Sequence, residues 1–246
     1  MLLKKSILIS IFTLVAIAGF SQPQRKPLNL IHYDYVRKLR FGFTLGVNVL
    51  DFSTVNTLKP VSLTPGGTPI PVRADVVTMR PGFSVNGIMD YRLSSYFNLR
   101  FLPGIAFGSR ELHFFDENAR DNVVLHKMPM ASNYIEFPIH LKYSAKRHSN
   151  IRPYVIGGIN LRSNLSYGYD ENEGNYLELN RFEPFYELGV GFDTYFYFFK
   201  LSVELKVSKG AEDVLIKRSA APGYYQYLDV IDKMNSQMIQ LSFHFE

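Results

Sequence analysis

The sequence predicts an all-β fold, an antiparallel up-and-down transmembrane β-barrel of about eight strands that is preceded by a signal peptide. Three observations predict this fold. Eight segments alternate apolar and polar residues with a period of two, each runs for about nine to twelve residues, and the links between them are alternately long and short. A tilted strand needs about 9–11 residues to cross the hydrocarbon layer of a bilayer. Long outside loops and short periplasmic turns are typical of outer-membrane barrels.

The composition is compatible with a single barrel domain. The chain has 246 residues, a size that barrels often reach as one unit. Its mean hydropathy is −0.05, as in a soluble protein, but a barrel that alternates lipid-facing and lumen-facing residues also averages near zero. The 20 Phe and 16 Tyr residues favour strands and interfacial aromatic girdles over a helical bundle.

Several classes of function are excluded or disfavoured. The absence of cysteine excludes disulfides, thiolate metal sites, a cysteine nucleophile and a lipoprotein anchor. The net charge of +5 raises the question of nucleic acid, yet the basic residues are dispersed along the chain, whereas a nucleic-acid interface clusters them on one face. No HExxH, GxSxG, Walker or GxGxxG pattern occurs in a usable context. The sequence therefore predicts no catalysis, no cofactor, no metal and no nucleic-acid partner.

Residues 1–21 are predicted to be a secretory signal peptide. Lys4 and Lys5 supply the positive start, an apolar stretch follows, and Gly19 and Ser21 are the small residues of a cleavage site. The alternative is an N-terminal membrane anchor, which is disfavoured because the apolar run has about 15 residues and a spanning helix needs about 20. Since no other long apolar run occurs, a mature chain that spans a membrane must do so as a barrel.

Residues 22–40 are predicted to be a periplasmic N-terminal segment, and residues 41–246 the outer-membrane barrel. The N-terminal segment is too long to be only the lead-in to a strand, and it is rich in basic residues, so a periplasmic contact is expected there. The basic residues are Arg25, Lys26, Arg37, Lys38 and Arg40.

The first four predicted strands alternate cleanly. In each, apolar side chains occupy every second position, and mainly glycine or polar residues lie between them. The apolar, lipid-facing positions run from Phe41 to Val49, from Phe83 to Tyr91, from Phe97 to Phe107 and from Ile135 to Tyr143.

The last four predicted strands repeat the pattern with one change of parity. The fifth is looser, the sixth places its apolar residues at even positions, and the seventh is the sharpest of all. The eighth is apolar at alternate positions up to the penultimate residue, as is common where the last strand of an outer-membrane barrel closes against the first. The apolar positions run from Val155 to Leu165, Tyr186 to Thr194, Phe199 to Val207 and Ile239 to Phe245.

The links between these strands alternate in length. The odd links are expected to be long exterior loops and the even links short periplasmic turns. The long ones are residues 51–77, 109–131, 168–181 and 209–236, and the short ones are residues 92–96, 145–151 and 196–198. Residues 59–71, with four prolines and paired glycines, are expected to be irregular. Residues 224–233 are expected to form a short amphipathic helix that caps the barrel mouth, with partner docking as the alternative.

The inward positions carry both signs of charge in near balance. Six basic candidates, which include Arg152, face five acidic ones, which include Asp90. Since lone charges are costly in a low-dielectric lumen, we interpret them as a paired, structural polar network; a proton or ion pathway is the alternative. The predicted members of this network are Arg100, Glu136, His140, Lys142, Arg162, Glu187, Asp193, Lys200, Glu204 and Lys206. An eight-stranded lumen has room only for such side chains, so folded cargo cannot pass.

A lipid-modifying barrel enzyme is the catalytic alternative. It requires a His, a Ser and an acidic residue that converge on the outer wall near the rim. The third link offers His113, His126 and Ser132, with Glu111 and Asp116 nearby. No spacing selects these residues, because loops contain such residues by default, so the sequence favours a protein without catalysis.

Four segments carry motifs that can be compared with known families: residues 135–143 (IEFPIHLKY), 152–158 (RPYVIGG), 185–192 (FYELGVGF) and 197–209 (YFFKLSVELKVSK), followed by Val214-Leu215. They resemble the PorT family of outer-membrane barrels from Bacteroidota. The resemblance extends over about residues 38–246, although Val203 stands where relatives commonly have proline.

The resemblance implies a place in the type IX secretion machinery, which exports proteins with a C-terminal signal domain and in some species supports gliding. The large conduit of that system is a different protein, so an accessory or assembly component is implied. The expected partners are membrane lipids including lipopolysaccharide, and other secretion-system proteins at the N-terminal segment or the exterior loops. The alternative is a general scaffold or adhesion barrel whose exterior loops bind a surface partner.

Overall fold

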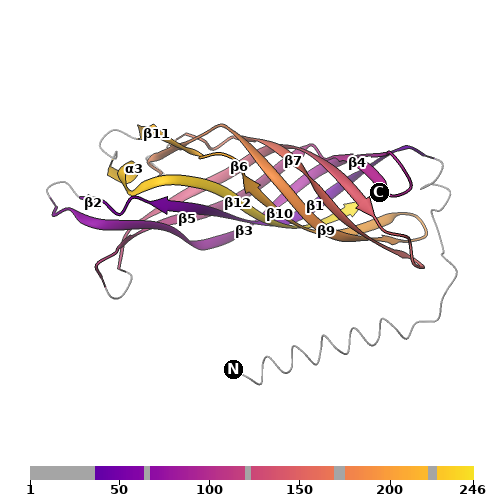
Figure 1. Cartoon of the computed structure of the whole chain (residues 1–246), viewed down its shortest axis with the longest axis horizontal. Helices are drawn as coiled ribbons and strands as arrows, with labels where there is room; N and C mark the ends of the chain where they lie inside the picture. Colours follow the sequence, from indigo (N-terminus) through magenta and orange to yellow (C-terminus); the bar gives the residue numbers. More distant parts are fainter. Residues whose placement is uncertain (1–36, 64–66, 120–122, 169–174, 221–225) are drawn as a thin grey trace, which may run out of the picture.

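A computed structural model describes residues 37–63, 67–119, 123–168, 175–220 and 226–246. These residues form twelve antiparallel strands and one short helix (Figure 1). The predicted signal peptide lies outside the described residues, as does most of the predicted N-terminal segment. No helix of the described chain is long and apolar enough to cross a membrane.

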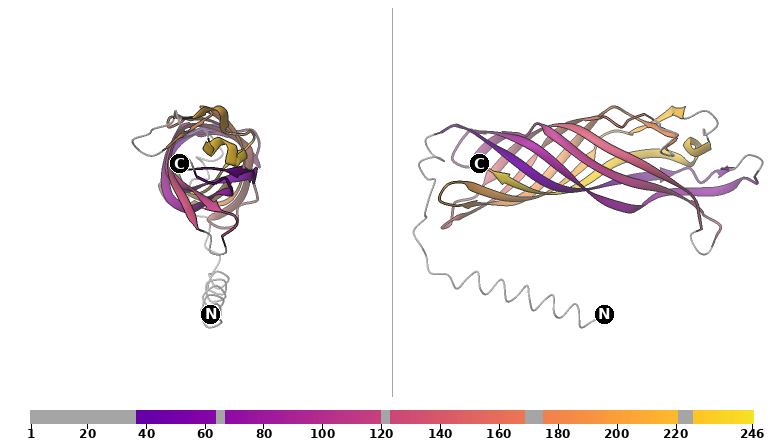
Figure 2. Two further views of the ribbon diagram at one scale, coloured as in Figure 1. Left: turned by 90° about the vertical axis from the view of Figure 1, so that its left-hand side faces the viewer. Right: turned by 180° about the vertical axis from the view of Figure 1, so that it is seen from behind.

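The long strands form a closed ring with eight positions, here called walls, each made by one strand or by two consecutive strands. Each wall pairs with the walls before and after it in the chain, and the ring closes because β1 pairs with both β3 and β12. One wall consists of two consecutive strands, β4 and β5, which both pair with β3 and β6. The walls are β1 (Leu39–Asn56), β3 (Ile70–Arg92), β4 (Phe97–Phe101) with β5 (Gly104–Asp116), β6 (Val124–Ser144), β7 (Ile151–Asn164), β9 (Phe182–Tyr195), β10 (Lys200–Gly210) and β12 (Ile231–Phe245). Figure 2 shows the ring from one end and from the side.

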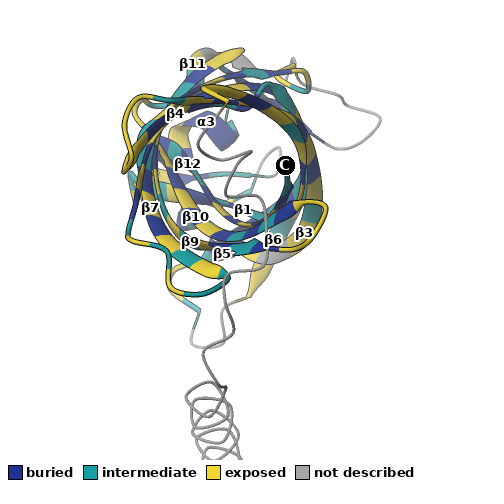
Figure 3. Cartoon of the chain, turned by 90° about the vertical axis from the view of Figure 1, so that its right-hand side faces the viewer, coloured by how far each residue is buried: buried dark blue, intermediate teal, exposed yellow. Residues whose placement is uncertain are grey.

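The period of two decides which side chains face inward. In β1, for example, Thr44 and Asn48 are buried in the ring, whereas Phe41 and Val47 are exposed on the outer wall. The same alternation continues around the ring, as the dark and light bands of Figure 3 show. All eight predicted strands are therefore confirmed, with the predicted residues on the outer face, including the change of parity in β9.

The outer wall is apolar over the whole circumference. Exposed apolar patches larger than a few hundred Å² mark contact with a membrane or a partner in soluble proteins, and here every wall contributes to one. Among the exposed side chains are Phe43, Leu45, Val85, Leu99, Ile105, Ile139, Leu141, Val155, Leu161, Leu188, Val190, Leu205, Val207 and Leu241. A belt of this kind is stable only against lipid.

Two expectations about strand continuity are wrong. The third predicted strand is interrupted at Leu102 and Pro103, because proline lacks the N–H that a ladder needs. The backbone there is bonded through other groups: Leu102 N–H donates to the Pro138 carbonyl, and the Pro103 carbonyl accepts from Gly87 N–H. The parity of the wall survives the break, since Phe101 and Ile105 both point outward.

The second correction concerns the long links, which are partly strand. β3 begins at Ile70, and β5 and β6 continue until only residues 117–123 separate them, instead of the expected 109–131. Within residues 59–71, β2 (Pro60–Val61) pairs with the start of β3, so this link is not wholly irregular. β3 has 23 residues and β6 has 21, about twice the 9–11 that a membrane crossing requires.

The two ends of the ring differ. We call the end that holds residues 37–38, the turns 93–96, 145–150 and 196–199, and Glu246 the terminal end; the other is the distal end (Figure 1). The three turns match the expected short links closely. A row of ring contacts near the terminal end runs from Phe43 on β1 to Phe245 on β12, and on to Phe199 and Phe196 in the turn 196–199. This row corresponds to the interfacial girdle that the aromatic composition predicts.

The distal end has an apolar core of its own. β8 (Leu177–Leu179) pairs with β11 (Leu215–Ala220), and α3 (Gln226–Val230) leads directly into β12. α3 falls within the predicted helix 224–233, but the helix ends at Val230 because the chain continues as strand from Ile231. The buried cluster, here called the distal core, comprises Phe52, Val61, Val72, Ala74, Val76, Leu112, Phe114, Met128, Met130, Leu177, Leu179, Val214, Leu215, Tyr227, Leu228, Val230, Ile231 and Met234.

Candidate functional site

The interior of the ring is the most densely charged part of the described chain. Seven basic and seven acidic side chains are buried there, so the formal charges cancel. The basic ones are Arg40, Arg100, Arg110, Lys142, Arg162, Lys200 and Lys206, and the acidic ones are Asp90, Glu136, Glu183, Glu187, Asp193, Glu204 and Glu246. Such charges are tolerated in a low-dielectric interior only when they are paired and hydrogen-bonded.

Near the terminal end, two carboxylates hold three cations. Asp90 on β3 accepts from Arg40 at 2.8 Å and from Arg100 at 3.2 Å. Glu246, directly after β12, accepts from Arg100 at 2.9 Å and from Lys200 at 2.7 Å. Arg100 thus ties β3 to the chain that follows β12, two strands that flank β1 in the ring.

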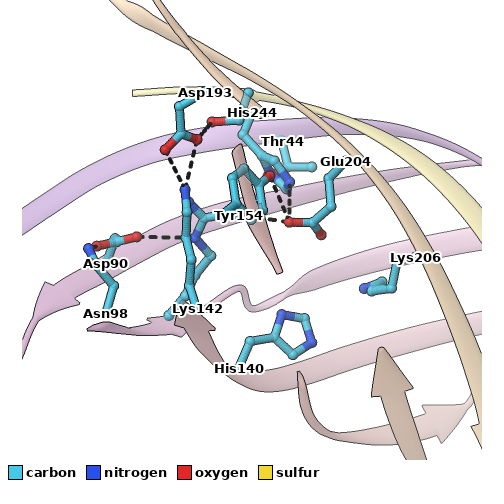
Figure 4. Close-up of polar contacts among 12 residues, drawn as sticks. Thr44, Asp90, Asn98, His140, Lys142, Tyr154, Asp193, Glu204, Lys206 and His244 are labelled. Carbon is cyan, nitrogen blue, oxygen red and sulfur yellow. Dashed lines mark hydrogen bonds and ion pairs between the residues drawn. The ribbon is translucent and has the colours of Figure 1, made fainter. Parts of the chain in front are cut away.

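The next layer is built around Lys142. Its ammonium donates to both oxygens of Asp193, at 2.7 and 2.9 Å, and lies 3.7 Å from the centre of the Tyr154 ring (Figure 4). Tyr154 reaches across the lumen because Gly191 opposes it; a Cβ at Gly191 would lie 2.6 Å from the ring. The Tyr154 hydroxyl donates to Glu204 at 2.9 Å.

Glu204 connects this layer to β1 and β12. His244 lies 3.4 Å from Glu204 through Nε2, and its Nδ1 is 2.7 Å from the Thr44 hydroxyl (Figure 4). Arg100 approaches Glu204 at 3.6 Å. A single carboxylate therefore joins strands from opposite sides of the ring.

Glu187 is the centre of the distal half of the network. Four neighbours surround it: His140 at 2.6 Å, Ser208 at 2.8 Å, Arg162 at 2.9 Å and Lys206 at 3.0 Å. Asn160 adds a fifth contact at 3.0 Å. Arg162 also pairs with Glu136 at 2.7 Å, so two carboxylates share one guanidinium between β6, β7 and β9.

Above this layer, Arg110 marks the change from polar lumen to apolar core. Its guanidinium donates to the Tyr134 hydroxyl at 2.9 Å, to Ser132 at 3.1 Å and to the Asp51 carbonyl at 2.7 Å. It also lies 3.3 Å from the centre of the Phe52 ring, which belongs to the distal core. Beyond Arg110 the interior is filled by the distal core. The lumen is therefore closed by ion pairs toward the terminal end and by apolar packing toward the distal end.

All ten predicted network residues lie in this interior, and each is bonded to another buried group. Arg152 differs from the expectation for an inward cation: it donates to the carbonyls of Ala145 and Ser95 in the terminal-end turns. Among the described residues, no group of three or more His, Asp or Glu side chains is arranged to hold a metal ion.

Sequence reasoning missed four buried charges, namely Arg40, Arg110, Glu183 and Glu246. Each continues the inward parity of a predicted strand beyond its assumed end: Arg40 precedes Gly42, Arg110 follows Gly108, Glu183 precedes Phe185, and Glu246 follows His244. Extending every strand by one or two inward positions finds all four.

The residues of the catalytic alternative do not converge. Ser132 faces the lumen and accepts from Arg110. The His126 ring contacts the tilted rings of Tyr176 and Tyr227. His126 lies six residues from Ser132 along β6, a separation of about 20 Å at 3.3 Å per residue. His113 instead contacts Glu111. The described residues therefore form no His–Ser–acid cluster of the kind that alternative requires.

Comparisons with known proteins place this ring among membrane barrels. The family model described as "Outer membrane protein beta-barrel domain" matches residues 20–214. No curated protein matches the chain. Neisserial surface protein A is similar at 11% identity, covering 85% of this chain and 98% of its own, with a TM-score of 0.40. The outer membrane protein OprG from Pseudomonas aeruginosa is similar at 11% identity, covering 83% and 94%, with a TM-score of 0.44.

Proposed function

The chain belongs to the family of outer membrane protein β-barrel domains, and from this premise we propose that it is an accessory or assembly component of type IX protein secretion. It is a protein of the outer membrane. The similarity of residues 135–158 and 185–215 to the PorT family supports the type IX assignment. The accessory role is supported by the filled lumen, in which the carboxylates and cations of opposite walls are bonded to one another.

The lumen is filled by buried cationic side chains. The large cationic side chains Arg100, Arg110, Arg162 and Lys142 are each no more than 1% exposed, so the space between the walls is occupied. Opening a path for a polypeptide would strand several charges at about 3–5 kcal/mol for each broken pair. We therefore propose that cargo crosses the membrane through another protein and that this barrel supports that protein.

We propose that the terminal end faces the periplasm, because short turns lie on that side in outer-membrane barrels. Secretion partners would then contact the N-terminal segment 22–40 from the periplasm or the distal end from outside. The apolar outer wall contacts membrane lipids, including lipopolysaccharide in the outer leaflet. We also propose that the barrel performs no catalysis.

The test is a clean deletion in the native host. Cargo with the C-terminal signal domain is quantified in the medium and in the periplasm. We expect periplasmic retention in the deletion strain and restored export with a plasmid copy. Export at the wild-type level in the deletion strain would refute the type IX proposal and leave the fold assignment intact.

A second candidate function is that of a surface scaffold or adhesion barrel. It is favoured by the length of β3 and β6, which carry the ring beyond a membrane crossing, and by the distal core that makes this extension rigid. If the deletion leaves export unchanged, loss of cell adhesion or of a surface protein would support this candidate.

A further inference from the structure

The terminal end carries a strongly basic surface. Residues 37–38, Arg92 and the turns 93–96, 145–150 and 196–199 include cations but no Asp or Glu. The acidic side chains closest to this surface, Asp90, Asp193 and Glu246, are buried and paired within the lumen. The basic residues of this surface are Arg37, Lys38, Arg92, Lys146, Arg147 and Arg152.

A cleft lies on this surface where the start of β1 meets the turn between β3 and β4. It has a volume of about 320 Å³ and is lined by Lys38, Tyr91, Arg92, Leu93, Ser94 and Ser95. The lining combines two cations and two hydroxyl groups with an aromatic and an aliphatic side chain. Tyr91 and Leu93 are 43% and 55% exposed, so the apolar wall of the cleft is continuous with the lipid-facing belt.

The walls of the cleft are held in place by hydrogen bonds of the backbone and of the turns. Arg92 N–H donates to the Lys38 carbonyl at 2.8 Å, which fixes the start of β1 against the end of β3. The Ser94 hydroxyl accepts from Phe97 N–H at 3.1 Å. Arg152 donates to the Ser95 carbonyl and to the Ala145 carbonyl, which ties the cleft turn to the neighbouring turn.

The depth of the cleft in the membrane follows from its neighbours. Tyr96 and Phe97, which continue the same turn, both contact the Tyr143 ring on the outer wall. Aromatic side chains of barrels gather at the level of the lipid head groups. A ligand in the cleft therefore meets cations at head-group depth and apolar side chains toward the bilayer interior.

We propose that this cleft binds the phosphate head group of an anionic phospholipid in the inner leaflet of the outer membrane. Lys38 and Arg92 attract the phosphate, the serine hydroxyls are within the same lining, and the acyl chains lie along Tyr91 and Leu93. A soluble acidic protein fits less well, because it would cover Tyr91 and Leu93 only by displacing lipid. This function is independent of the secretion role proposed above.

The test uses the full mature chain purified in a non-ionic detergent and native mass spectrometry with two probes, phosphatidylglycerol and phosphatidylcholine of matched acyl chains. We expect the chain to bind phosphatidylglycerol more tightly. Each cation near an anionic lipid surface contributes about 1 kcal/mol, so K38Q should weaken that binding about five-fold and K38Q/R92Q about 30-fold. Binding of phosphatidylcholine should not change.

The matched control is K127Q/K217Q, which removes two exposed cations from the distal end. It should bind phosphatidylglycerol like the wild type. Heat-modifiable gel migration checks that every variant is folded. Equal loss in the control and in K38Q/R92Q, or no preference of the wild type for phosphatidylglycerol, would overturn the proposal. Complete competition by inorganic phosphate or by a polyglutamate peptide would also overturn it, because the lipid would then be replaceable by any anion.

Discussion

Replacing Glu187 by glutamine tests whether the interior is held together by paired charges. The substitution keeps the volume of the side chain and removes the charge that faces Arg162, Lys206 and His140. Arg162 keeps Glu136 as a partner at 2.7 Å. Lys206, in the described part of the chain, pairs with Glu187 alone. E187Q therefore leaves this buried ammonium without an ion-pair partner among the described residues, and Glu204 acts on it only at longer range.

Leaving one member of a buried ion pair unpartnered costs about 3–5 kcal/mol. We expect E187Q to lower the free energy of unfolding by that amount. With an m-value of about 3 kcal/mol/M, the guanidinium midpoint should fall by about 1 to 1.7 M. Unfolding is measured in detergent micelles by far-UV circular dichroism and by heat-modifiable migration.

Two further variants make the test specific. K206M/E187Q removes the stranded ammonium, so it should be more stable than E187Q alone, with a coupling energy of about 1–3 kcal/mol. E212Q changes an exposed carboxylate at the distal end and should stay within about 0.5 kcal/mol of the wild type. A wild-type midpoint for E187Q would show that the buried ion pairs do not hold the interior together, as would a K206M/E187Q variant no more stable than E187Q.

Three other predictions follow from the interior. The pure protein should give negligible conductance in planar bilayers, and large, stable single-channel steps would contradict a lumen closed by ion pairs. R110M should destabilise the chain by about 3 kcal/mol or more in guanidinium titrations, because Tyr134 and Ser132 lose a charged donor. H126F should leave stability unchanged or raise it by up to about 1 kcal/mol, since His126 Nε2 is buried without a hydrogen bond among aromatic rings; a large loss would show that the imidazole has a polar partner.

The eight walls could be predicted from the sequence because a strand with one face in lipid and one in a polar lumen must alternate strictly. Outside the membrane this constraint no longer holds, and the predicted ends of the strands are less accurate there. Beyond the membrane both faces of a strand can be apolar or polar, as at Leu112 to Phe115, where four consecutive residues are buried. A period of two no longer identifies the strand there, so the sequence predicts an end of the third strand near Gly108, whereas β5 continues to Asp116.

The polar lumen was predicted by residue but not by pairing. Parity places Lys142 and Asp193 inside, yet it does not say that they meet across β6 and β9, two walls that have β7 between them. Contacts of this kind depend on the curvature of the closed ring and on small residues such as Gly191, which lets Tyr154 extend beneath Lys142. The predicted cap helix supplies only a small part of the distal core. The other members come from all four long links, and no local pattern reveals how these links lie relative to one another.

The two closures of the barrel have a consequence for where its function can lie. Glu187 and Arg162 close the lumen on the side of the terminal end, and Arg110 with the distal core closes it on the side of the distal end. Substitutions such as E187Q should therefore act on function only through the amount of folded protein. Substitutions at the terminal end, such as K38Q, leave these contacts intact and change a surface that faces lipid or partners. Suppose that E187Q, compared at an equal amount of folded protein, exports cargo normally while terminal-end variants do not: the functional surfaces of the barrel then lie at its ends. The reverse result would mean that the lumen itself takes part in transport.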